Sequence, residues 1–337
     1  MRKSFMLNLI ITSLLLVFYA NSVSAKVWVV NNNAGGPGDF VSAQLAHTAS
    51  SAGDTLYFVG STSNYGTLLL SKKLTLIGPG YFLNENQNTY SNKSTASFNY
   101  IYANQGNEAT VTSGSYQSKL IGLEIDYLEL NTNEISVVRS KILRIRNLAS
   151  ENLSGLILKQ NYIVNLEGNT FNFTNSIFTN NIFTGTFLYT VNSVIRNNTF
   201  LKNYGSDGSN EFVNNIFADY TTITFNFNMD ANNLRNNIFG GKNTNDTRNT
   251  IGINNVFDAY GNIIKSSGTS DGIFQLKEGS VAAGAGEEGV DCGAFGGSEP
   301  YILSGLPPIP VIYGITIPSS VNKNDGLQVE IKVKVQN

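Results

Sequence analysis

The chain has 337 residues, of which 41% are hydrophobic and only 14% are charged, and its formal net charge is −2. This composition excludes intrinsic disorder, and it offers no basic surface for nucleic acid or an anionic membrane. A single cysteine, Cys292, excludes an intramolecular disulfide, and a single histidine, His47, excludes a zinc site built from several histidines.

The first residues have the pattern of a secretory signal peptide. Arg2 and Lys3 precede an apolar stretch from Phe5 to Tyr19, and small residues then lead to Ala25. The apolar stretch is shorter than the roughly 20 residues that a membrane span needs, and no later stretch approaches that length. We therefore expect cleavage after Ala25 and a protein located in the periplasm, on the cell surface or outside the cell, with no membrane span.

The segment after the signal peptide predicts a cap. Asp39 follows a Gly-Pro-Gly turn and is a good helix N-cap, so we expect a helix over Phe40–Ser51. A polar-faced helix would cover the exposed core and strand edges at the end of a solenoid. We expect His47 to be half-exposed on this helix, without a catalytic role. The inward-facing helix residues would be Phe40, Leu45, Ala46 and Ala49.

Two strands should follow this cap helix. The first is expected at Thr55–Val59, and the second contains Leu74 and Leu76, which we expect to face inward before a Gly-Pro-Gly turn.

A short motif then recurs at intervals of about 20 residues, a period typical of a solenoid. It reads NNIF at 180–183, 214–217 and 236–239, NNTF at 197–200 and NNVF at 254–257. The same frame extends upstream through Asn161, Ser140 and Leu123. Leucine-rich repeats lack support because their L-x-x-L-x-L framework is missing, and propellers need a period of about 40 residues.

The motif predicts a stacked core and a stacked row of amides. Because residues two apart face the same side of a strand, the second Asn and the Phe must both point inward. The double Asn would form a bend, and each second Asn would bond to its equivalents in the coils above and below. We therefore assign these residues to the scaffold and not to a ligand site. The amide positions are Asn161, Asn181, Asn198, Asn215, Asn237 and Asn255, and the stacked rings are Phe183, Phe200, Phe217, Phe239 and Phe257.

The C-terminal residues differ from the repeats. Ser298–Pro310 contains four prolines and reads as a linker or strap, and two strand patterns follow at Val311–Ile317 and Leu327–Val335. In the second pattern aliphatic and polar residues alternate, which predicts one buried face. Because an isolated hairpin is marginally stable, we expect it to pack on the last coils, with addition to another sheet as the alternative.

Four stretches together carry a resemblance to a known family: GDFVSAQLAHTASSAGDTLYFVGS, LTLIGPGYFL, the NNIF repeats and AAGAGEEGVDCGAFGG. They resemble secreted bacterial right-handed parallel β-helix proteins of the pectate-lyase-like superfold. The resemblance implies an all-β, single-stranded right-handed solenoid over residues 26–297, with a cap region at 26–60. Residues 298–337 would add the strap and a C-terminal hairpin. The superfold includes lyases, hydrolases, epimerases and adhesins, so it does not specify an activity.

No recognised catalytic set is present. A lyase needs a base and a cation that neutralises a uronate, and a glycoside hydrolase needs two carboxylates on one face. The Asn-Thr-Asp, Asp-Asp, Gly-His and Arg-Ile-Lys motifs of the polygalacturonase family are absent. We expect no cofactor, because calcium would fit a lyase but no calcium motif occurs. Glu287 and Glu288 read as a solvated closing loop.

Two groups of polar residues remain as candidates for ligand binding. Arg144 and Arg146 would point outward from one strand if Leu143 and Ile145 point inward, with acidic residues of the preceding coil paired to them. Two long insertions, Leu201–Glu211 and Gly240–Thr250, would reach the same edge of the solenoid, where loops on a rigid scaffold carry function. Their candidate residues are Lys202, Asp207, Glu211, Lys242, Asp246 and Arg248.

Three functions stay open at this point. The first is a monomeric secreted or surface protein that binds a polysaccharide or cell-surface glycan, or is structural, without catalysis. The second is a polysaccharide lyase or glycoside hydrolase with an unfamiliar site on the two insertions. The third is an adhesin or surface-layer component whose C-terminal hairpin docks to a partner by strand addition.

Overall fold

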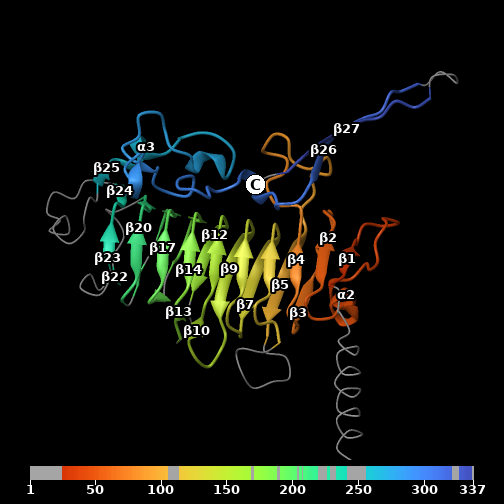
Figure 1. Cartoon of the computed structure of the whole chain (residues 1–337), viewed down its shortest axis with the longest axis horizontal. Coiled ribbons are helices and arrows are strands. Elements are labelled where there is room, and N and C mark those ends of the chain that lie inside the picture. Colours follow the sequence, from red (N-terminus) through yellow and green to blue (C-terminus); the bar gives the residue numbers. More distant parts are fainter. Residues whose placement is uncertain are drawn as a thin grey trace, which may run out of the picture.

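Short strands of the chain stack into two ten-stranded parallel sheets that run the length of a solenoid (Figure 1). The predicted parallel β-helix, with a helix near its N-terminal end and a C-terminal hairpin, is confirmed. No helix among the described residues is long and apolar enough to cross a membrane. The structure is a computed structural model, and it describes residues 25–104, 114–167, 171–187, 190–202, 205–206, 208–218, 226–227, 233–240, 256–320 and 326–335.

The first sheet takes one strand from each successive coil. In order along the solenoid its strands are β1 (Val27–Val30), β2 (Thr55–Phe58), β4 (Thr75–Ile77), β6 (Lys119–Ile121), β8 (Ser136–Val138), β11 (Ile157–Lys159), β14 (Ile177–Thr179), β17 (Val194–Arg196), β20 (Glu211–Val213) and β23 (Asn233–Arg235).

The second sheet is built in the same way from the strands that follow each bend. Its strands are β3 (Thr67–Leu70), β5 (Ser97–Ala103), β7 (Glu124–Leu130), β9 (Lys141–Asn147), β12 (Tyr162–Glu167), β15 (Ile182–Phe183), β18 (Thr199–Phe200), β21 (Ile216–Phe217), β24 (Ile238–Gly240) and β25 (Val256–Asp258). Smaller parallel sheets are formed by β10 (Leu153–Ser154), β13 (Phe173–Thr174) and β16 (Thr190–Val191), and by β19 (Gly205–Ser206) and β22 (Asn226–Phe227).

Identical positions of successive coils pair with one another, so like side chains stack. The rings of Phe183, Phe200, Phe217 and Phe239 lie 5.0 Å apart from centroid to centroid and nearly parallel, in a buried column. The backbone of Phe257 continues the same register beside Phe239. Stacked aromatic rings thus fill the interior of the later coils. The earlier coils are filled mostly by aliphatic side chains, with Phe58, Tyr65 and Phe98 in contact near the N-terminal end.

The second Asn of each motif lies in a continuous row of hydrogen bonds. The side-chain Nδ2 of Asn161 donates to Oδ1 of Asn181 at 3.0 Å, and the row continues through Asn198 and Asn215 to Asn237 at 3.0–3.1 Å. These side chains are fully buried, so the row satisfies amide groups that no water reaches. Asn255 lies outside the described residues.

The first Asn of each motif makes the bend. Asn180, Asn197, Asn214 and Asn236 all have a left-handed backbone with φ between 53° and 56°. Asn tolerates this conformation better than most residues, because its short polar side chain can form local hydrogen bonds. The two Asn residues of each motif therefore have different roles: the first forms a left-handed corner and the second supplies a buried amide.

The cap helix is shorter than predicted. Helix α2 spans Ala43–Ala49, and its N-cap is Ser42, whose hydroxyl accepts the Leu45 amide, whereas Asp39 accepts the backbone N–H of Val29. On this helix Leu45 is exposed, whereas Ala43, Ala46 and His47 form the buried face.

Three predictions for this helix were therefore wrong, because Leu45 and Ala49 do not face inward and His47 is not half-exposed. His47 is buried, and its Nε2 atom accepts the Ser71 amide at 3.1 Å. Leu74 and Leu76 are buried as predicted.

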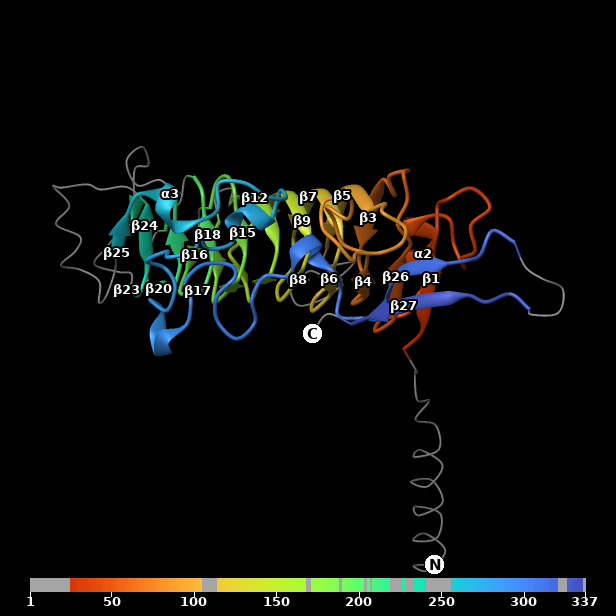
Figure 2. The same ribbon diagram turned by 90° about the horizontal axis from the view of Figure 1, so that it is seen from above.

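After β25 the chain reverses and returns along the outside of the solenoid (Figures 1 and 2). This part contains the short helices α3 (Tyr260–Ile263), η2 (Gly272–Phe274), η3 (Glu287–Gly289) and η4 (Leu303–Gly305). We call residues 285–306 the strap, because side chains at the left-handed corners hold it along many coils.

Four corner side chains show how the strap is held. Asn236 donates to the carbonyl of residue 285 at 3.1 Å, and Asn180 donates to the carbonyls of residues 294 and 296 at 3.0 and 2.7 Å. Gln160 donates to the carbonyls of residues 299 and 300, and Arg139 to that of residue 306. The side chains at the left-handed corners of successive coils therefore bind the returning chain along the solenoid.

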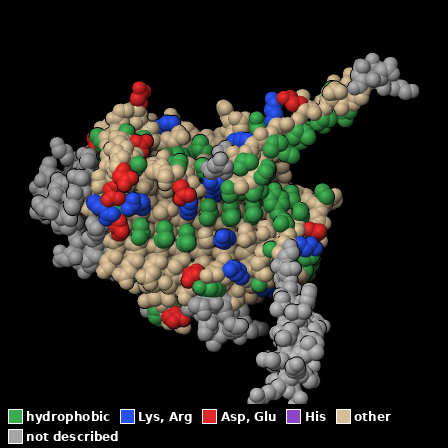
Figure 3. Space-filling view, in the orientation of Figure 1, with side chains coloured by type: hydrophobic (Ala, Val, Ile, Leu, Met, Phe, Trp, Pro, Cys, Tyr) green, Lys and Arg blue, Asp and Glu red, His purple; other side chains and the backbone are tan. Residues whose placement is uncertain are grey.

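Four residues after the strap comes the hairpin of β26 (Val311–Thr316) and β27 (Glu330–Lys334), which projects beyond the N-terminal coils (Figure 2). Its apolar face is exposed, and Figure 3 shows hydrophobic side chains along the hairpin. The exposed aliphatic residues of β27 and its flanks are between 45% and 57% accessible, and they are Leu327, Val329, Ile331, Val333 and Val335. The predictions of a buried face and of packing on the last coils were wrong. The strap carries the chain back to the opposite end of the solenoid before the hairpin begins.

Candidate functional site

Arg144 and Arg146 point outward from β9, beside the ring of Tyr127, with each guanidinium 5.8 Å from the ring centroid. Contrary to the prediction, Leu143 does not face inward: it is 43% exposed, and the buried aliphatic residues of the strand on either side of it, Ile142 and Ile145, lie three positions apart. Both guanidinium groups have a carboxylate partner from a neighbouring coil. Arg146 pairs with Glu129, and Arg144 lies 3.6 Å from Glu167.

The side chains of the two predicted insertions do not form one site among the described residues. Lys202 is exposed just after β18 of the second sheet, whereas Glu211 opens β20 of the first. Asp207, Lys242, Asp246 and Arg248 lie outside the described residues, so their grouping stays a prediction.

Glu211 belongs to a network of four charged groups, three on the first sheet and one, Glu287, on the strap. Arg235 pairs with Glu211 and with Glu287, and Arg196 lies 3.6 Å and 3.2 Å from the same two carboxylates. Glu287 was expected in a solvated loop, but these pairs anchor the start of the strap to the coils.

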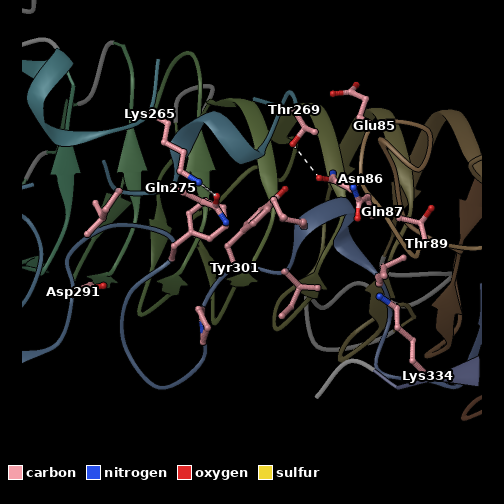
Figure 4. A pocket seen from close by; sticks show the side chains of 16 residues that line it. Glu85, Asn86, Gln87, Thr89, Lys265, Thr269, Gln275, Asp291, Tyr301 and Lys334 are labelled. Atoms are coloured by element: carbon pink, nitrogen blue, oxygen red, sulfur yellow. Dashed lines mark hydrogen bonds between the residues drawn. The ribbon is translucent and has the colours of Figure 1, made fainter. Parts of the chain in front are cut away.

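A cleft of about 880 Å³ opens where the strap passes two other segments (Figure 4). One wall is the loop containing residues 85–89, which connects β4 to β5, and another is the turn at 265–276. The strap forms the third wall, and Lys334 of the hairpin reaches its rim. We call this concavity the strap cleft.

The walls of the strap cleft are tied together by the buried carboxylate of Asp271. Its Oδ1 atom accepts the side-chain amide of Asn86 at 2.9 Å, and its Oδ2 atom accepts the backbone N–H of Ser304 at 2.7 Å. The hydroxyl of Tyr301 donates to the same carboxylate at 3.3 Å and contacts the hydroxyl of Tyr81. One side chain thus joins three segments that are far apart in the sequence, which holds the cleft in shape.

Burial raises the pKa of the Tyr81 and Tyr301 phenols well above their ordinary value. Both side chains are almost fully buried, so they remain neutral and serve as hydrogen-bonding struts beneath the cleft. Neither phenol is placed to exchange a proton with a ligand in solvent.

The accessible surface of the strap cleft combines aromatic and polar groups. Phe295 packs edge-to-face on Tyr301 at 5.2 Å, and the polar side chains around them include Gln87 and Gln275. Lys265 Nζ donates to Gln275 Oε1 at 2.5 Å, and both labelled side chains face the cleft in Figure 4. An aromatic surface beside amide donors and acceptors suits a hydroxyl-rich ligand.

Two carboxylates line the same cleft, Glu85 and Asp291. Each is engaged by a backbone amide: Glu85 accepts the N–H of Ser270 at 2.6 Å, and Asp291 accepts that of Gly284 at 2.9 Å. Two lysines, Lys265 and Lys334, balance their charge. The geometry therefore favours recognition by hydrogen bonds over recognition of a net charge.

A second groove, of about 790 Å³, runs along the outer face of the first sheet, across several coils. Its polar chain joins Lys73 to Gln117 at 2.9 Å and Gln117 to Glu134 at 2.9 Å. No aromatic side chain is among the lining residues that the structure describes. We therefore regard the strap cleft as the better candidate site.

Within the described ranges, no group of three or more His, Cys, Asp or Glu side chains is arranged to hold a metal ion. Comparison with models of known protein families and with curated proteins finds no match for this chain. The candidate site therefore has to be interpreted from its own geometry.

The strap cleft was missed by the sequence analysis. Its side chains come from a loop, a turn and the returning strap, and none of these is part of the repeat. The one available signal was the unusually long interval between the strand at Thr75–Ile77 and the next strand at Ser97–Ala103.

Proposed function

We propose that the protein is a secreted or cell-surface β-helix that binds carbohydrate in the strap cleft without catalysis. The observation that carries the proposal is the half-buried ring of Phe295, supported from beneath by Tyr301, beside flanking amides in a cleft that the Asp271 hydrogen bonds hold open. A saccharide offers an apolar ring face and many hydroxyl groups, which match such a surface. The balanced charges favour a neutral glycan as the ligand.

Export and superfold are part of the same proposal. The first strand begins at Val27, two residues after the expected cleavage point at Ala25, so removal of the leader would leave the strands of the solenoid intact. The stacked parallel sheets, the amide row and the capping helix support membership of the pectate-lyase-like superfold. That superfold includes carbohydrate-active proteins, although a shared fold alone does not establish function.

The first experiment is size-exclusion analysis of a panel of acidic and neutral polysaccharides, incubated with the mature protein and calcium. We expect the polysaccharide chains to keep their length. In native gel electrophoresis, we expect the protein to migrate more slowly when the gel contains a polysaccharide that it binds. Shortened chains would instead support a lyase or hydrolase, and absence of retardation across the panel would overturn the binding proposal.

Matched variants locate the site. Gln87→Ala and Lys265→Ala remove exposed polar groups of the strap cleft. We expect each to lower the affinity for the polysaccharide by about tenfold, as the loss of one hydrogen bond to the ligand would, and so to reduce the retardation in the gel. Lys277→Ala and Glu278→Ala change exposed residues close by in sequence that do not line the cleft, and they should bind as the unaltered protein does.

A second candidate function, docking to a surface partner, is favoured by the C-terminal hairpin. Eight large aliphatic side chains of its described part are 40–60% exposed, which is unusual for a two-stranded ribbon. Deleting residues 311–337 would then release the protein from cells and leave the solenoid folded. Unchanged cell association of the truncated protein would exclude this role.

A further inference from the structure

The carboxylate of Asp54 lies in the first coil and receives three N–H groups. Its Oδ1 atom accepts the backbone nitrogen of Lys26 at 2.8 Å, and its Oδ2 atom accepts the indole of Trp28 and the amide of Ser51, both at 2.9 Å. The residue is 4% exposed. An acidic group covered to this degree normally has a cation among its partners.

The side-chain ammonium group of Lys26 makes no hydrogen bond to this carboxylate, although, against the opposing effect of burial, the hydrogen bonds and this charge together lower the pKa of Asp54. The ammonium group lies over the face of the Trp28 ring, 3.1 Å from the centroid, in a cation–π contact. The groups that hydrogen-bond to the Asp54 carboxylate are therefore two amides and an indole, all of them neutral in the intact chain.

Lys26 is also the residue at which the solenoid begins. Its carbonyl accepts the backbone N–H of Thr55 at 2.8 Å, and strand β1 starts at the next residue, Val27. The preceding residue, Ala25, is exposed, and it is the residue after which the signal peptide is expected to be cut. The nitrogen that would become the new N-terminus is thus the one that already points at the Asp54 carboxylate.

We propose that the Asp54 carboxylate is a preformed acceptor for the mature N-terminus, so that removal of the signal peptide creates an ion pair between the Lys26 α-ammonium group and Asp54. This inference rests on the proposed export and is independent of carbohydrate binding. A signal peptidase would add water across the Ala25–Lys26 bond, so that Ala25 leaves with a carboxylate and the Lys26 nitrogen becomes an α-amine. That amine takes up a proton at neutral pH and becomes an ammonium group.

The ion pair changes the stability of the end of the solenoid. A charge-assisted hydrogen bond is about twice as strong as a neutral one, and the ammonium group has three N–H donors where the peptide had one. Coils at the end of a solenoid have a neighbour on one side only, so they open most readily. Processing would therefore tighten β1 against β2, the pair in which Val27 faces Thr55.

The test compares four purified proteins, which begin at Lys26 or at Ala25 and carry either the native Asp54 or the substitution Asp54→Asn. A cleavable fusion tag gives each start, and Asp54→Asn keeps the shape of the side chain and one acceptor oxygen. The measurement is hydrogen exchange of the β1 amides. With the native Asp54 we expect about tenfold stronger protection for the Lys26 start, and with Asp54→Asn we expect no difference between the two starts. Equal protection of the two proteins that retain Asp54 would overturn the proposal.

A second measurement requires no substitution. The α-amine of the Lys26-start protein should react with an acylating reagent at neutral pH much more slowly than that of the Ala25-start protein, because the carboxylate holds its proton. Equal reactivity would overturn the ion pair. The mass of the exported protein tests the processing itself: an N-terminus other than Lys26 would overturn both the cleavage proposal and this inference, whereas Lys26 without added protection would overturn the inference alone.

Discussion

The side-chain amide of Asn198 donates to Oδ1 of Asn215 at 3.1 Å, and that oxygen also accepts the backbone N–H of Asn198 at 2.9 Å. One oxygen therefore binds two donors of the coil before it. A slip of one residue between the coils would break both bonds and turn the Phe column outward. The amide row thus fixes the register of coils whose strands are only two or three residues long.

Removing one amide from this row should be costly. Asn198→Ala leaves several buried groups without a partner, among them the carbonyl of Phe178 and the backbone N–H of Asn181. At about 1–3 kcal/mol for each unsatisfied group, we expect a loss of about 3–4 kcal/mol in the free energy of unfolding, measured in urea. Asn262→Ala removes an exposed amide, and it should change that free energy by less than about 0.5 kcal/mol. Similar losses for the two variants would contradict the structural role of the row.

The first Asn of a motif should act on the strap and not on the coils. Asn180→Ala removes the two hydrogen bonds to the carbonyls of residues 294 and 296. We expect faster hydrogen exchange and proteolysis of residues 285–306, while the amides of the two large sheets keep their protection.

The control for this variant is Asn175→Ala. Asn175 also has a left-handed backbone, but its exposed side chain binds only Ser154, at 3.3 Å. Both variants bear the strain of a left-handed alanine, so the difference between them isolates the contact to the strap. A strap that is protected to the same degree in both would show that these bonds do not hold it.

The repeat could be predicted from the sequence because equivalent positions of successive coils are buried in the same way. The period, the inward Phe column and the second Asn all follow from the alternation of side chains along a strand. The cap helix and the hairpin lie outside the repeat, so the alternation of side chains could not predict which of their residues are buried. Leu45 of the cap helix lies on its exposed face because the helix packs through Ala43, Ala46 and His47, and the position of Val333 in the hairpin depends on where the strap carries the chain.

The candidate site could not be predicted either, because its residues are also outside the repeat. The strap cleft depends on Asp271 meeting Asn86 and Ser304 across long sequence separations. No local pattern encodes such contacts, whereas Arg144 and Arg146 were visible because they alternate along one strand. Sequence periodicity therefore locates the scaffold of this protein better than it locates a site built from connecting segments.

Stability should fall as the pH is lowered from about 6.5 to about 4, in part through His47. Burial, aided by the charge of Lys72, lowers the pKa of this imidazole from 6.5 to about 4. In that window the unfolded chain binds a proton that the folded chain does not, so the contribution of His47 is complete above pH 6.5 and is lost toward pH 4. The expected loss is on the order of 2–3 kcal/mol.

The measurement is urea unfolding at several pH values for the unaltered protein and for His47→Gln. The Gln side chain can still accept the Ser71 amide, but it does not titrate. The slope of stability against pH between 6.5 and 4 should be smaller in the variant. Parallel curves for the two proteins would mean that His47 titrates equally in the folded and unfolded chains.

The exposed face of the hairpin predicts an unusual tolerance of polar substitutions. Ile331 is 55% exposed in β27, so Ile331→Thr should leave the free energy of unfolding within about 0.5 kcal/mol of its original value. Ile145 is fully buried in β9, and Ile145→Thr should cost several kcal/mol, because it leaves a cavity and brings a hydroxyl group into the core. Urea unfolding measures both changes, and binding of a hydrophobic dye should decrease only for Ile331→Thr. A large loss of stability for Ile331→Thr in the isolated protein would show that this face is covered in solution, which would remove the argument that it is free to dock a partner.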